Sequence, residues 1–388
     1  MTIYTETGLT VHVAPSLFAG SYVFTEFALT DDLLSYTHQI DAYGGYISAQ
    51  ITLTADMGEA ENWLENGLMR HIVVYDSAMQ IIWAGFVNAI GISLNGLQVR
   101  RGPALGITNR VIINYSPLDI SVSPPVSGSS TNTAYVDDAE SQAKYGILED
   151  RISGGNITTA NALDLRDYYL AEHKDPETAQ SFDTEGAGAI SVALECAGYI
   201  EYLDRYTFSA ASLVSQSVTA KILAVLAANP NISIFSTDYT KVETNAMLVP
   251  VADFKEQTAK EVIKGLVALG DAASNRSVFG LYANQRFAYN VIPTTFDYVA
   301  RISTREVSLY GGNFVVQPWN ILPGRWLFYD DLLTGMGTIT GIPTKSDPRV
   351  QFIENVVYTA PFGINMAGGK TGRLSQKIAK LGVSGTWS

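Results

Sequence analysis

The amino-terminal part of the chain alternates between short apolar runs and polar turns at the spacing of β-strands. Residues 71–75 and 81–87 are largely apolar, and the five residues between them have the length of a hairpin loop. Short antiparallel runs of this kind are typical of a β-sandwich or a small β-barrel. One short helix is expected at 58–64. The strands of this first unit are expected at 46–53, 71–75, 81–87, 96–99 and 111–115.

The middle of the chain changes from strand signals to helix signals. Residues 116–133 contain three prolines and a Gly-Ser-Ser run, which interrupt both helices and β-ladders, so this segment is predicted to be a linker. A helix is expected to begin near Asp137 and to end at Tyr145, with Gly146 as its C-cap. A second helix is expected at 159–173, where apolar positions approximate one face and a proline follows shortly.

Strand signals return after residue 189 and enclose a mixed segment. Strands are expected at 190–196 and 199–203, and helices at 218–228 and 257–269. A hairpin is expected from strands at 277–282 and 286–291, with the turn at 283–285. Residues 215–295 are therefore predicted to form an α/β insertion inside a second β unit. That unit resumes with strands at 306–310, 326–329, 337–341 and 352–358.

The expected fold is mainly β with α/β insertions, an α+β arrangement that contains two β units. The two β units have similar patterns of short strands, which suggests a distant duplication. The predicted domains are a first β unit at 1–118, a linker and helical α+β domain at 119–184, the start of a second β unit at 185–214, an inserted α/β domain at 215–297, the rest of the second β unit at 298–363, and a basic tail at 364–388.

The carboxyl-terminal segment differs in charge from the rest of the chain. It has no acidic residue after Glu354, but it has four basic residues from position 370 onward. Residues 374–381 can form a short amphipathic helix, because three apolar residues follow at positions i, i+4 and i+7. The segment is interpreted either as a frayed terminus or as a docking segment for a partner. The candidate interface residues are Lys370, Arg373, Leu374, Lys377, Ile378 and Leu381.

Composition narrows the class of protein. Of the 388 residues, 47% are hydrophobic and only 16% are charged, against a usual charged share of about 25%. This composition excludes a disordered chain, and 21 tyrosines with few charges suit a protein that buries much of its surface against partners. The net charge of −13 argues against a general nucleic-acid binder. No membrane-spanning segment and no signal peptide are expected.

Motifs for catalysis are absent or incomplete. The sequence around Lys370 approaches a phosphate-binding loop, but position 364 is Ile where that loop requires Gly. The four histidines show no metal-binding spacing. His71 and Cys196 lie in strand patterns and are interpreted as buried structural residues. The adjacent carboxylates at 31–32, 137–138 and 330–331 are assigned to turns or helix N-caps. No catalytic, cofactor-binding or metal-binding residue is predicted, so the chain is not expected to be an enzyme.

Several segments between residues 73 and 363 are informative about the protein family because of their order and spacing, although none is diagnostic alone. They are 73–76 with 82–87, 109–115, 141–146, the helix with 166–170, 192–199 with Leu203 and Tyr206, 268–271 with 278–282, Tyr289 and 293–295, 321–327, and 356–363. In this order they resemble bacteriophage tail hub proteins, also called baseplate hub or tail-tip hub proteins.

The resemblance implies a structural protein of the virion rather than an enzyme. It implies that the two β units are small, tube-like β-barrel domains, at 1–118 and at 185–214 with 298–363, each with an inserted or appended helix-containing domain. It also implies a homotrimer, in which six barrels match the six-fold symmetry of a tail tube. Such a hub joins a hexameric distal tail or tail tube protein to a trimeric spike or central fibre. The tape-measure protein and, during genome ejection, the DNA pass its lumen without specific binding. The chain would be made in the host cytoplasm and located at the tail tip or baseplate, with no membrane insertion and no cofactor.

Two other functions remain open from the sequence. A tail-associated cell-wall hydrolase is one, although no appended lysozyme or peptidase domain is seen and the motifs of hydrolases are missing. A carbohydrate-binding protein that recognises the receptor is the other, because exposed aromatic residues such as Trp319 can stack on sugars.

Overall fold

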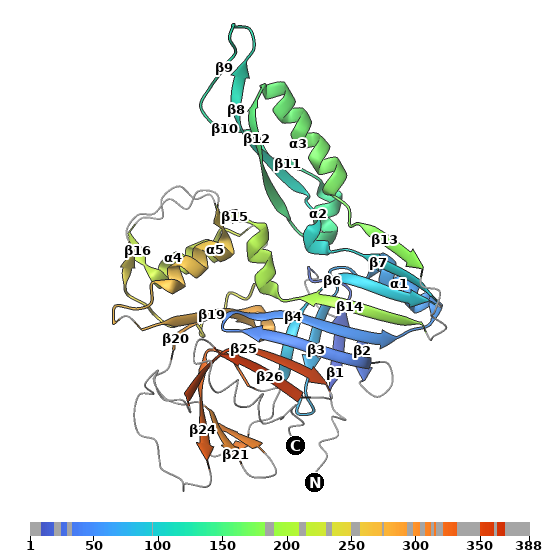
Figure 1. Ribbon diagram of the computed structural model, residues 1–388, viewed down its shortest axis with the longest axis vertical. Helices are drawn as coiled ribbons and strands as arrows, with labels where there is room; N and C mark the ends of the chain where they lie inside the picture. Colours follow the sequence, from blue (N-terminus) through green and yellow to red (C-terminus); the bar gives the residue numbers. More distant parts are fainter. Residues whose placement is uncertain are drawn as a thin grey trace.

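The computed structural model is mainly β with some helices, as the sequence predicted (Figure 1). No closed barrel is found among the described strands, so the two-barrel arrangement stays a prediction. The structure describes residues 9–18, 25–28, 33–94, 96–182, 190–208, 215–229, 235–249, 257–273, 275–292, 298–302, 307–311, 314–315, 321–331, 350–360 and 363–368.

The body of the molecule is one large sheet that begins with strands of the amino-terminal third. Each of these strands pairs antiparallel with its neighbours, from β2 through β1 and β5 to β6, and from β6 to β7. The bounds are β1 (Thr10–Ala14), β2 (Thr25–Ala28), β3 (Leu33–Asp41), β4 (Tyr43–Thr54), β5 (His71–Tyr75), β6 (Ile81–Leu94) and β7 (Leu97–Arg101).

Two strands from later in the chain complete this sheet. β14 (Ser191–Ala197) lies between β4 and β6, and its Val192 is paired with Leu53 on one side and Ile92 on the other. β25 (Val350–Ala360) pairs antiparallel with β3. Strands that the sequence assigned to two separate β units therefore share one hydrogen-bonded sheet. β13 (Thr178–Phe182) adds to β7 at its edge.

The carboxyl-terminal strands extend the sheet from β25. β24 pairs with β25, β21 runs parallel to β24, and residues 364–368 of the predicted basic tail lie in β26, which pairs with β25. The predicted strand at 337–341 falls outside the described residues. The bounds are β21 (Tyr298–Ile302), β22 (Val307–Gly311), β23 (Phe314–Val315), β24 (Arg325–Asp331) and β26 (Gly363–Gly368).

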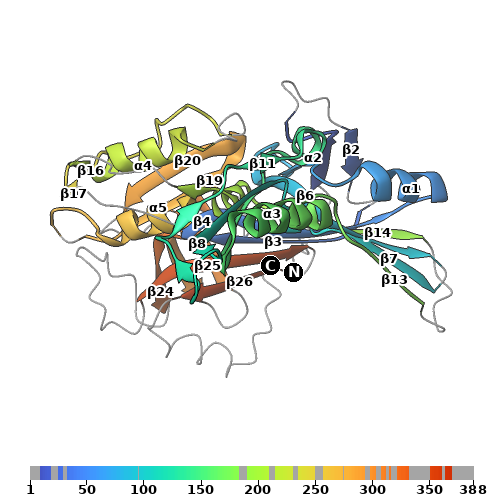
Figure 2. The same cartoon turned by 90° about the horizontal axis from the view of Figure 1, so that it is seen from above.

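The predicted α/β insertion contains the expected hairpin and helices. β19 (Ser277–Tyr282) and β20 (Arg286–Val291) pair antiparallel around the short 3-10 turn η4 (Ala283–Gln285). Helices α4 (Val218–Ala227) and α5 (Ala259–Ala268) pack together near this hairpin, at the end of the molecule that lies opposite to α1 (Figure 2). Short strands flank them: β15 (Thr207–Phe208), β16 (Gln216–Ser217), β17 (Leu248–Val249) and β18 (Gln257–Thr258).

Helix ends follow local capping chemistry. α1 (Met57–Asn66) begins with a capping box, because Asp56 accepts from the backbone N–H of Glu59 while the Glu59 side chain accepts from the Asp56 N–H. α2 (Ala139–Tyr145) ends at Gly146, whose φ of 74° is in the region that favours glycine. α3 (Thr159–His173) has the predicted bounds. The sequence therefore fixes these helix positions locally.

The strand predicted at 199–203 is wrong. Residues Tyr199–Arg205 form the 3-10 helix η2, and Tyr199, Ile200, Tyr202 and Leu203 are all buried. The two apolar pairs repeat at intervals of three residues, which is the period of a 3-10 helix rather than of a strand. Gly198 precedes the helix, and a Cβ at that position would lie 1.8 Å from the carbonyl oxygen of Tyr46. A close backbone contact therefore ends β14 and starts η2.

Candidate interaction surface

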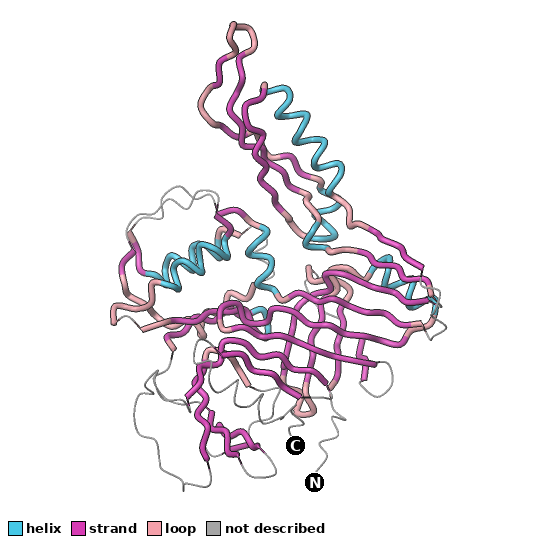
Figure 3. The backbone as a smooth tube through the Cα atoms, viewed as in Figure 1, coloured by secondary structure: helices cyan, strands magenta, loops and turns pink. Residues whose placement is uncertain are grey.

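A separate arm rises from the body of the molecule. Its central strand is β8 (Arg110–Asp119), which pairs in parallel with β12 (Glu149–Ile157) on one side. Short strands pair with β8 on the other side: β9 (Val126–Ser127), β10 (Thr131–Asn132) and β11 (Val136–Asp137). α3 lies along this sheet, and the arm projects away from the main sheet (Figures 1 and 3). We define the arm as residues 109–175.

The linker predicted at 116–133 is instead a folded part of this arm. β8 continues to Asp119, Leu118 is paired with Ser127, and Thr131 is paired with Tyr115. The backbone N–H of Gly128 also donates to the carbonyl of Pro117 at 2.7 Å. Pro117 lies within β8, where its carbonyl still accepts the Gly128 N–H, and Pro124 and Pro125 lie in the turn between β8 and β9, where no ladder hydrogen bond is needed.

The arm has a small core of its own. Val111, Ile113 and Tyr115 alternate along β8 and point toward α3, where Ala162 and Leu170 are buried against them. Alternate residues of a strand share one face of the sheet, so this pattern is sufficient to hold α3 on that face. The arm is thus a folded unit rather than a loop.

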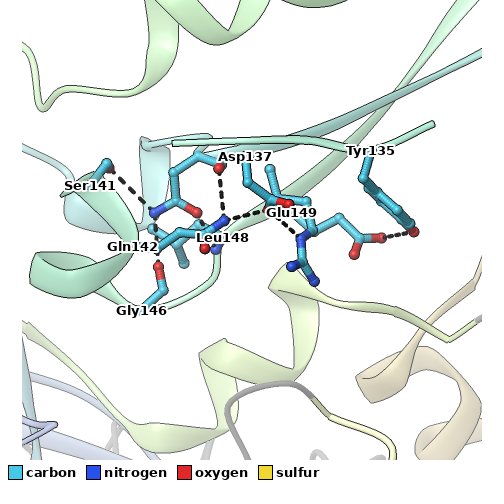
Figure 4. A network of polar contacts seen from close by, with 9 residues as sticks. Tyr135, Asp137, Ser141, Gln142, Gly146, Leu148 and Glu149 are labelled. Carbon is cyan, nitrogen blue, oxygen red and sulfur yellow. Dashed lines mark hydrogen bonds and ion pairs between the residues drawn. The ribbon is translucent and has the colours of Figure 1, made fainter. Parts of the chain in front are cut away.

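A network of polar side chains holds the base of the arm together (Figure 4). The Nδ2 of the fully buried Asn109 donates to the carbonyl of Gly146 at 2.8 Å, and its Oδ1 accepts from the backbone N–H of Leu148 at 2.8 Å. Gln142 donates from Nε2 to the Asn109 carbonyl at 3.0 Å and to Asp137 at 2.6 Å. One amide side chain therefore connects the start of β8 to the segment between α2 and β12.

A second part of this network lies at the start of β12. The hydroxyl of Tyr135 donates to Glu149 at 3.1 Å, and the guanidinium of Arg110 lies 5.4 Å from the centre of the Tyr135 ring. Burial raises the pKa of Glu149 above its ordinary value, and burial together with the Glu149 charge raises the pKa of Tyr135 to about 12. These groups fix the orientation of β12 and β11 relative to β8.

The arm is also tied to the body. The hydroxyl of Tyr202, in η2, donates to the carbonyl of Tyr145 at 2.5 Å. Arg205 donates to the carbonyl of Ile107, two residues before the arm begins, at 2.6 Å, and burial lowers the pKa of its guanidinium. Within the arm, Lys174 forms an ion pair with Asp138 at 3.0 Å. Side chain to backbone hydrogen bonds of this kind hold the base of the arm in one position on the body.

Exposed apolar side chains gather on the arm. Of the thirteen large apolar side chains that are exposed among the described residues, seven lie on it. Ile120, which follows β8 at the far end, is 67% exposed, and Tyr168 on α3 is 65% exposed. Exposed apolar side chains that are concentrated on one part of a protein are typical of a surface that packs against another protein. The seven are Ile120, Val122, Val126, Tyr135, Leu163, Leu165 and Tyr168.

The sequence missed this surface, although it contained a signal. Leu118, Ile120 and Val122 alternate with polar residues at the period of a strand. The nearby prolines and glycine favour a linker and so conceal that alternation. No spacing rule singled out Asn109, because the importance of its amide depends on the backbone of residues 146–148, which only the fold brings next to it.

The histidine, cysteine and carboxylate side chains that could carry chemistry occupy structural positions. His71 and Cys196 are buried, as predicted, and burial lowers the pKa of His71 to about 4 and raises that of the Cys196 thiol. Asp138 is the N-cap of α2, as predicted. Asp330 and Asp331 are not in a turn: they end β24, paired with Arg301 and Ile302, because the aromatic run before them continues the strand.

Other predicted positions fall outside the described residues. They are the pair at 31–32, Trp319, and all six candidate residues of the tail, which are Lys370, Arg373, Leu374, Lys377, Ile378 and Leu381. Within the described part of the chain, no group of three His, Cys, Asp or Glu side chains is placed to hold a metal ion. No described helix is both long and apolar enough to cross a bilayer.

No protein-family model and no curated protein match the chain. Among solved structures, it is similar to the tail protein from Neisseria meningitidis MC58, with 9% identity and a TM-score of 0.40 over 92% of this chain and 94% of that chain. It is also similar to the 43 kDa tail protein of prophage MuSo2 from Shewanella oneidensis, with 8% identity and a TM-score of 0.35 over 92% and 95% of the two chains.

A third similarity is to a chain of the Francisella PdpA–VgrG complex in its lidded form. It has 8% identity and a TM-score of 0.32, and it covers 79% of this chain and 33% of that chain. At these identities and TM-scores, the similarities assign the chain to no family.

Proposed function

We propose that this chain is a structural protein of a bacteriophage tail, and more specifically a hub at the distal end of the tail. The observation that carries the proposal is the arm, a folded projection that is fixed at its base and exposes seven large apolar side chains. Interface cores are depleted in charge and enriched in aromatic residues. The low charge content and the many tyrosines of the whole chain fit the same role. The distant similarities to tail proteins do not carry the proposal.

In the proposed hub, three copies form a ring between a hexameric distal tail or tube protein and a trimeric spike or central fibre. Two tube-like β-barrels per chain would match the six-fold symmetry of the tube, because three chains then present six similar units. An acidic lumen would repel the phosphates of DNA during ejection, which fits the net charge of −13. The proposed role involves no catalytic step.

The basic tail is part of this proposal as a docking segment. Its four basic residues would meet an acidic surface on a neighbouring tail protein, with Leu374, Ile378 and Leu381 forming the apolar side of a short helix. Lys370, Arg373 and Lys377 would supply most of the charge.

The arm offers a direct experiment. Ile120→Asp places a carboxylate on the exposed end of the arm, where it makes little difference to the fold but opposes burial against a partner. Leu248→Asp is the matched control, because Leu248 is 69% exposed and lies on β17, away from the arm. We expect Ile120→Asp to fold normally but to be lost from assembled tails, and Leu248→Asp to enter them normally. Equal incorporation of both variants contradicts the assignment of the arm as a partner surface.

A further inference from the structure

The outer side of α3 carries a stripe of exposed apolar surface. The helix packs on the arm sheet through Ala162 and Leu170, which are both buried. Leu165 and Tyr168 are three positions apart, so they are neighbours on the helix surface, where they are 36% and 65% exposed. Ala171, three positions further on, is exposed as well. These side chains form a helix face that no described part of the chain covers.

Two exposed carboxylates border this stripe. Asp164 lies one turn before Tyr168, and Glu172 lies one turn after it. Residues four apart on a helix are neighbours, so both carboxylates lie next to the tyrosine ring. A partner that covers the stripe therefore meets apolar surface and negative charge together.

The cations near the stripe already have partners. Arg166 is the one Lys or Arg of α3; its side chain is only 14% exposed and bonds to Asp167 and to the carbonyl of Ala134. Lys174, which follows the helix, pairs with Asp138. The whole arm has ten carboxylates and five Lys or Arg side chains, so its net charge is −5 with every cation counted. This surface therefore attracts a segment that is positively charged and partly apolar.

One segment of the chain has the matching pattern. Leu374, Ile378 and Leu381 follow at i, i+4 and i+7, and a Lys or Arg immediately precedes each of them. In a helix these cations form a second stripe beside the apolar one. α3 has the same arrangement with the opposite charge, because an Asp immediately precedes both Leu165 and Tyr168. Antiparallel packing relates two such helices by a twofold axis perpendicular to both, which places the two charged stripes on the same side of the contact.

The geometry of the body favours the segment of a neighbouring copy. Five residues separate Gly368, where β26 ends, from Leu374, and five extended residues span at most about 18 Å. The sheet passes from β26 through β25, β3 and β4 to β14 before the arm is reached (Figure 1). At about 4.8 Å per strand these four steps already span about 19 Å. The connection within one chain is therefore too short to place Leu374 on the outer side of α3.

We propose that the outer side of α3 binds the basic segment 370–381 of a second copy of this chain, as a helix antiparallel to α3. The apolar stripe of the segment covers Leu165 and Tyr168, and its cations lie beside Asp164 and Glu172. The inference names the partner of the arm and of the basic tail, and it rests on their proposed role as docking surfaces. Such a contact joins two different surfaces, so successive copies can close into a ring.

A labelled peptide of residues 369–388 tests the contact by fluorescence anisotropy. Its acceptor is the full chain with the four tail cations replaced by Gln, so that the acceptor's own tail does not compete. We expect binding that becomes at least about tenfold weaker when Asp164→Lys and Glu172→Lys are combined in the acceptor. Glu61→Lys with Glu65→Lys is the matched control, because it makes the same charge change at exposed positions of α1, outside the arm. This control is expected to bind the peptide as the unchanged acceptor does.

The apolar part of the contact is tested separately. Tyr168→Ala removes an exposed ring without changing charge, and we expect it to weaken binding severalfold while the chain unfolds at the same temperature. A peptide with Ser in place of Leu374, Ile378 and Leu381 keeps all four cations, and it is expected to bind at least about tenfold more weakly than the natural peptide. Equal binding of the two peptides would reduce the contact to general charge attraction and overturn the proposal.

Disulfide cross-linking shows which copy supplies the segment. Tyr168→Cys is placed in one full chain and Ile378→Cys in a second, tagged chain, and the mixture is oxidised with oxidised glutathione. The native Cys196 is buried and does not compete. We expect a cross-linked pair of one tagged and one untagged chain, and much less of it when Glu61→Cys replaces Tyr168→Cys. A chain that carries both Tyr168→Cys and Ile378→Cys is expected to link to other copies; linkage only within itself would overturn the proposal.

Other outcomes would assign the segment to a different partner. An equal loss of binding in the α1 control variant would remove α3 as the site. Tighter binding of the peptide to vesicles of phosphatidylglycerol and phosphatidylcholine than to the chain would assign the segment to a membrane surface. A peptide that does not bind the chain, although removal of 369–388 still impairs tail assembly, would overturn this inference and leave the proposed function in place.

Discussion

The side chain of Asn109 and the backbone of Leu148 join the starts of β8 and β12 at the base of the arm. The Asn109 Oδ1 accepts the Leu148 N–H at 2.8 Å, while the backbone N–H of Asn109 donates back to the Leu148 carbonyl at 3.0 Å. The same amide donates to Gly146, so one buried residue satisfies backbone groups on both sides of the turn. The junction of β8 and β12 at the base of the arm depends on this contact.

Replacing Asn109 tests that dependence. Asn109→Ala leaves the Leu148 N–H and the Gly146 carbonyl without this partner inside the protein, and each unsatisfied buried group costs about 1–3 kcal/mol. We therefore expect a loss of about 2–4 kcal/mol in the free energy of unfolding, measured by urea denaturation. Asn114→Ala is the control, because its partly exposed amide meets only the side chains of Asn132 and Ser130. Equal losses in the two variants would show that Asn109 has no special role.

Stability should fall in acid because of a buried histidine. Burial lowers the pKa of His38 to about 3, and its Nδ1 lies 2.8 Å from the Tyr36 hydroxyl. As the pH falls below about 6.5 the unfolded chain takes up a proton at this residue, but the folded chain does so only near pH 3. The folded state thus loses up to about 1.4 kcal/mol per pH unit across this window.

The pH dependence of unfolding in variants isolates this effect. We expect His38→Asn to have a smaller loss of stability between about pH 7 and pH 5 than the wild type. Ile40→Val, in the same strand and equally buried, should lower stability at both pH values without changing the slope. A slope that is the same in His38→Asn and in the wild type would assign the acid sensitivity to other groups.

A turn between β5 and β6 should become more stable with glycine. Met79 is 58% exposed and has a φ of 58°, where a side chain costs about 1–2 kcal/mol. Glycine removes that cost but adds about 0.5–1 kcal/mol of backbone entropy to the unfolded chain. We expect Met79→Gly to raise the free energy of unfolding by about 0.5–1 kcal/mol, and Met79→Ala, which keeps a Cβ, to leave it unchanged. No difference between the two variants would argue against backbone strain at this position.

Much of the local structure could be predicted from the sequence. The bounds of α3, the capping of α2 by Asp138 and Gly146, and the β19–β20 hairpin all follow from interactions within a few residues. Such signals are readable because caps, turns and alternation act over short distances.

The arrangement of the sheet could not be read in this way. β14 lies between β4 and β6, although about a hundred residues separate it from β6. A strand's pattern shows which face is buried, but it does not identify its neighbour in the sheet.

The basic tail can be tested by a truncation that spares the sheet. Removing 369–388 keeps β26 but deletes all four basic residues of the tail. We expect the truncated chain to unfold at the same temperature as the full chain and to enter tails less efficiently. Replacing Lys370, Arg373 and Lys377 with Gln should reproduce much of the defect if charge drives docking. Normal incorporation of the truncated chain would remove the tail from the proposed interface.

The central proposal concerns where the chain lies in the particle and in how many copies. Averaged electron cryomicroscopy images of the tail end of assembled particles, with a tag on this chain, measure both directly. We predict three copies in a ring around a threefold axis at the distal end, a mass of about 126 kDa for three 42.0 kDa chains. A tail end without this chain, or with the chain present as a single copy away from any threefold ring, would contradict the proposal.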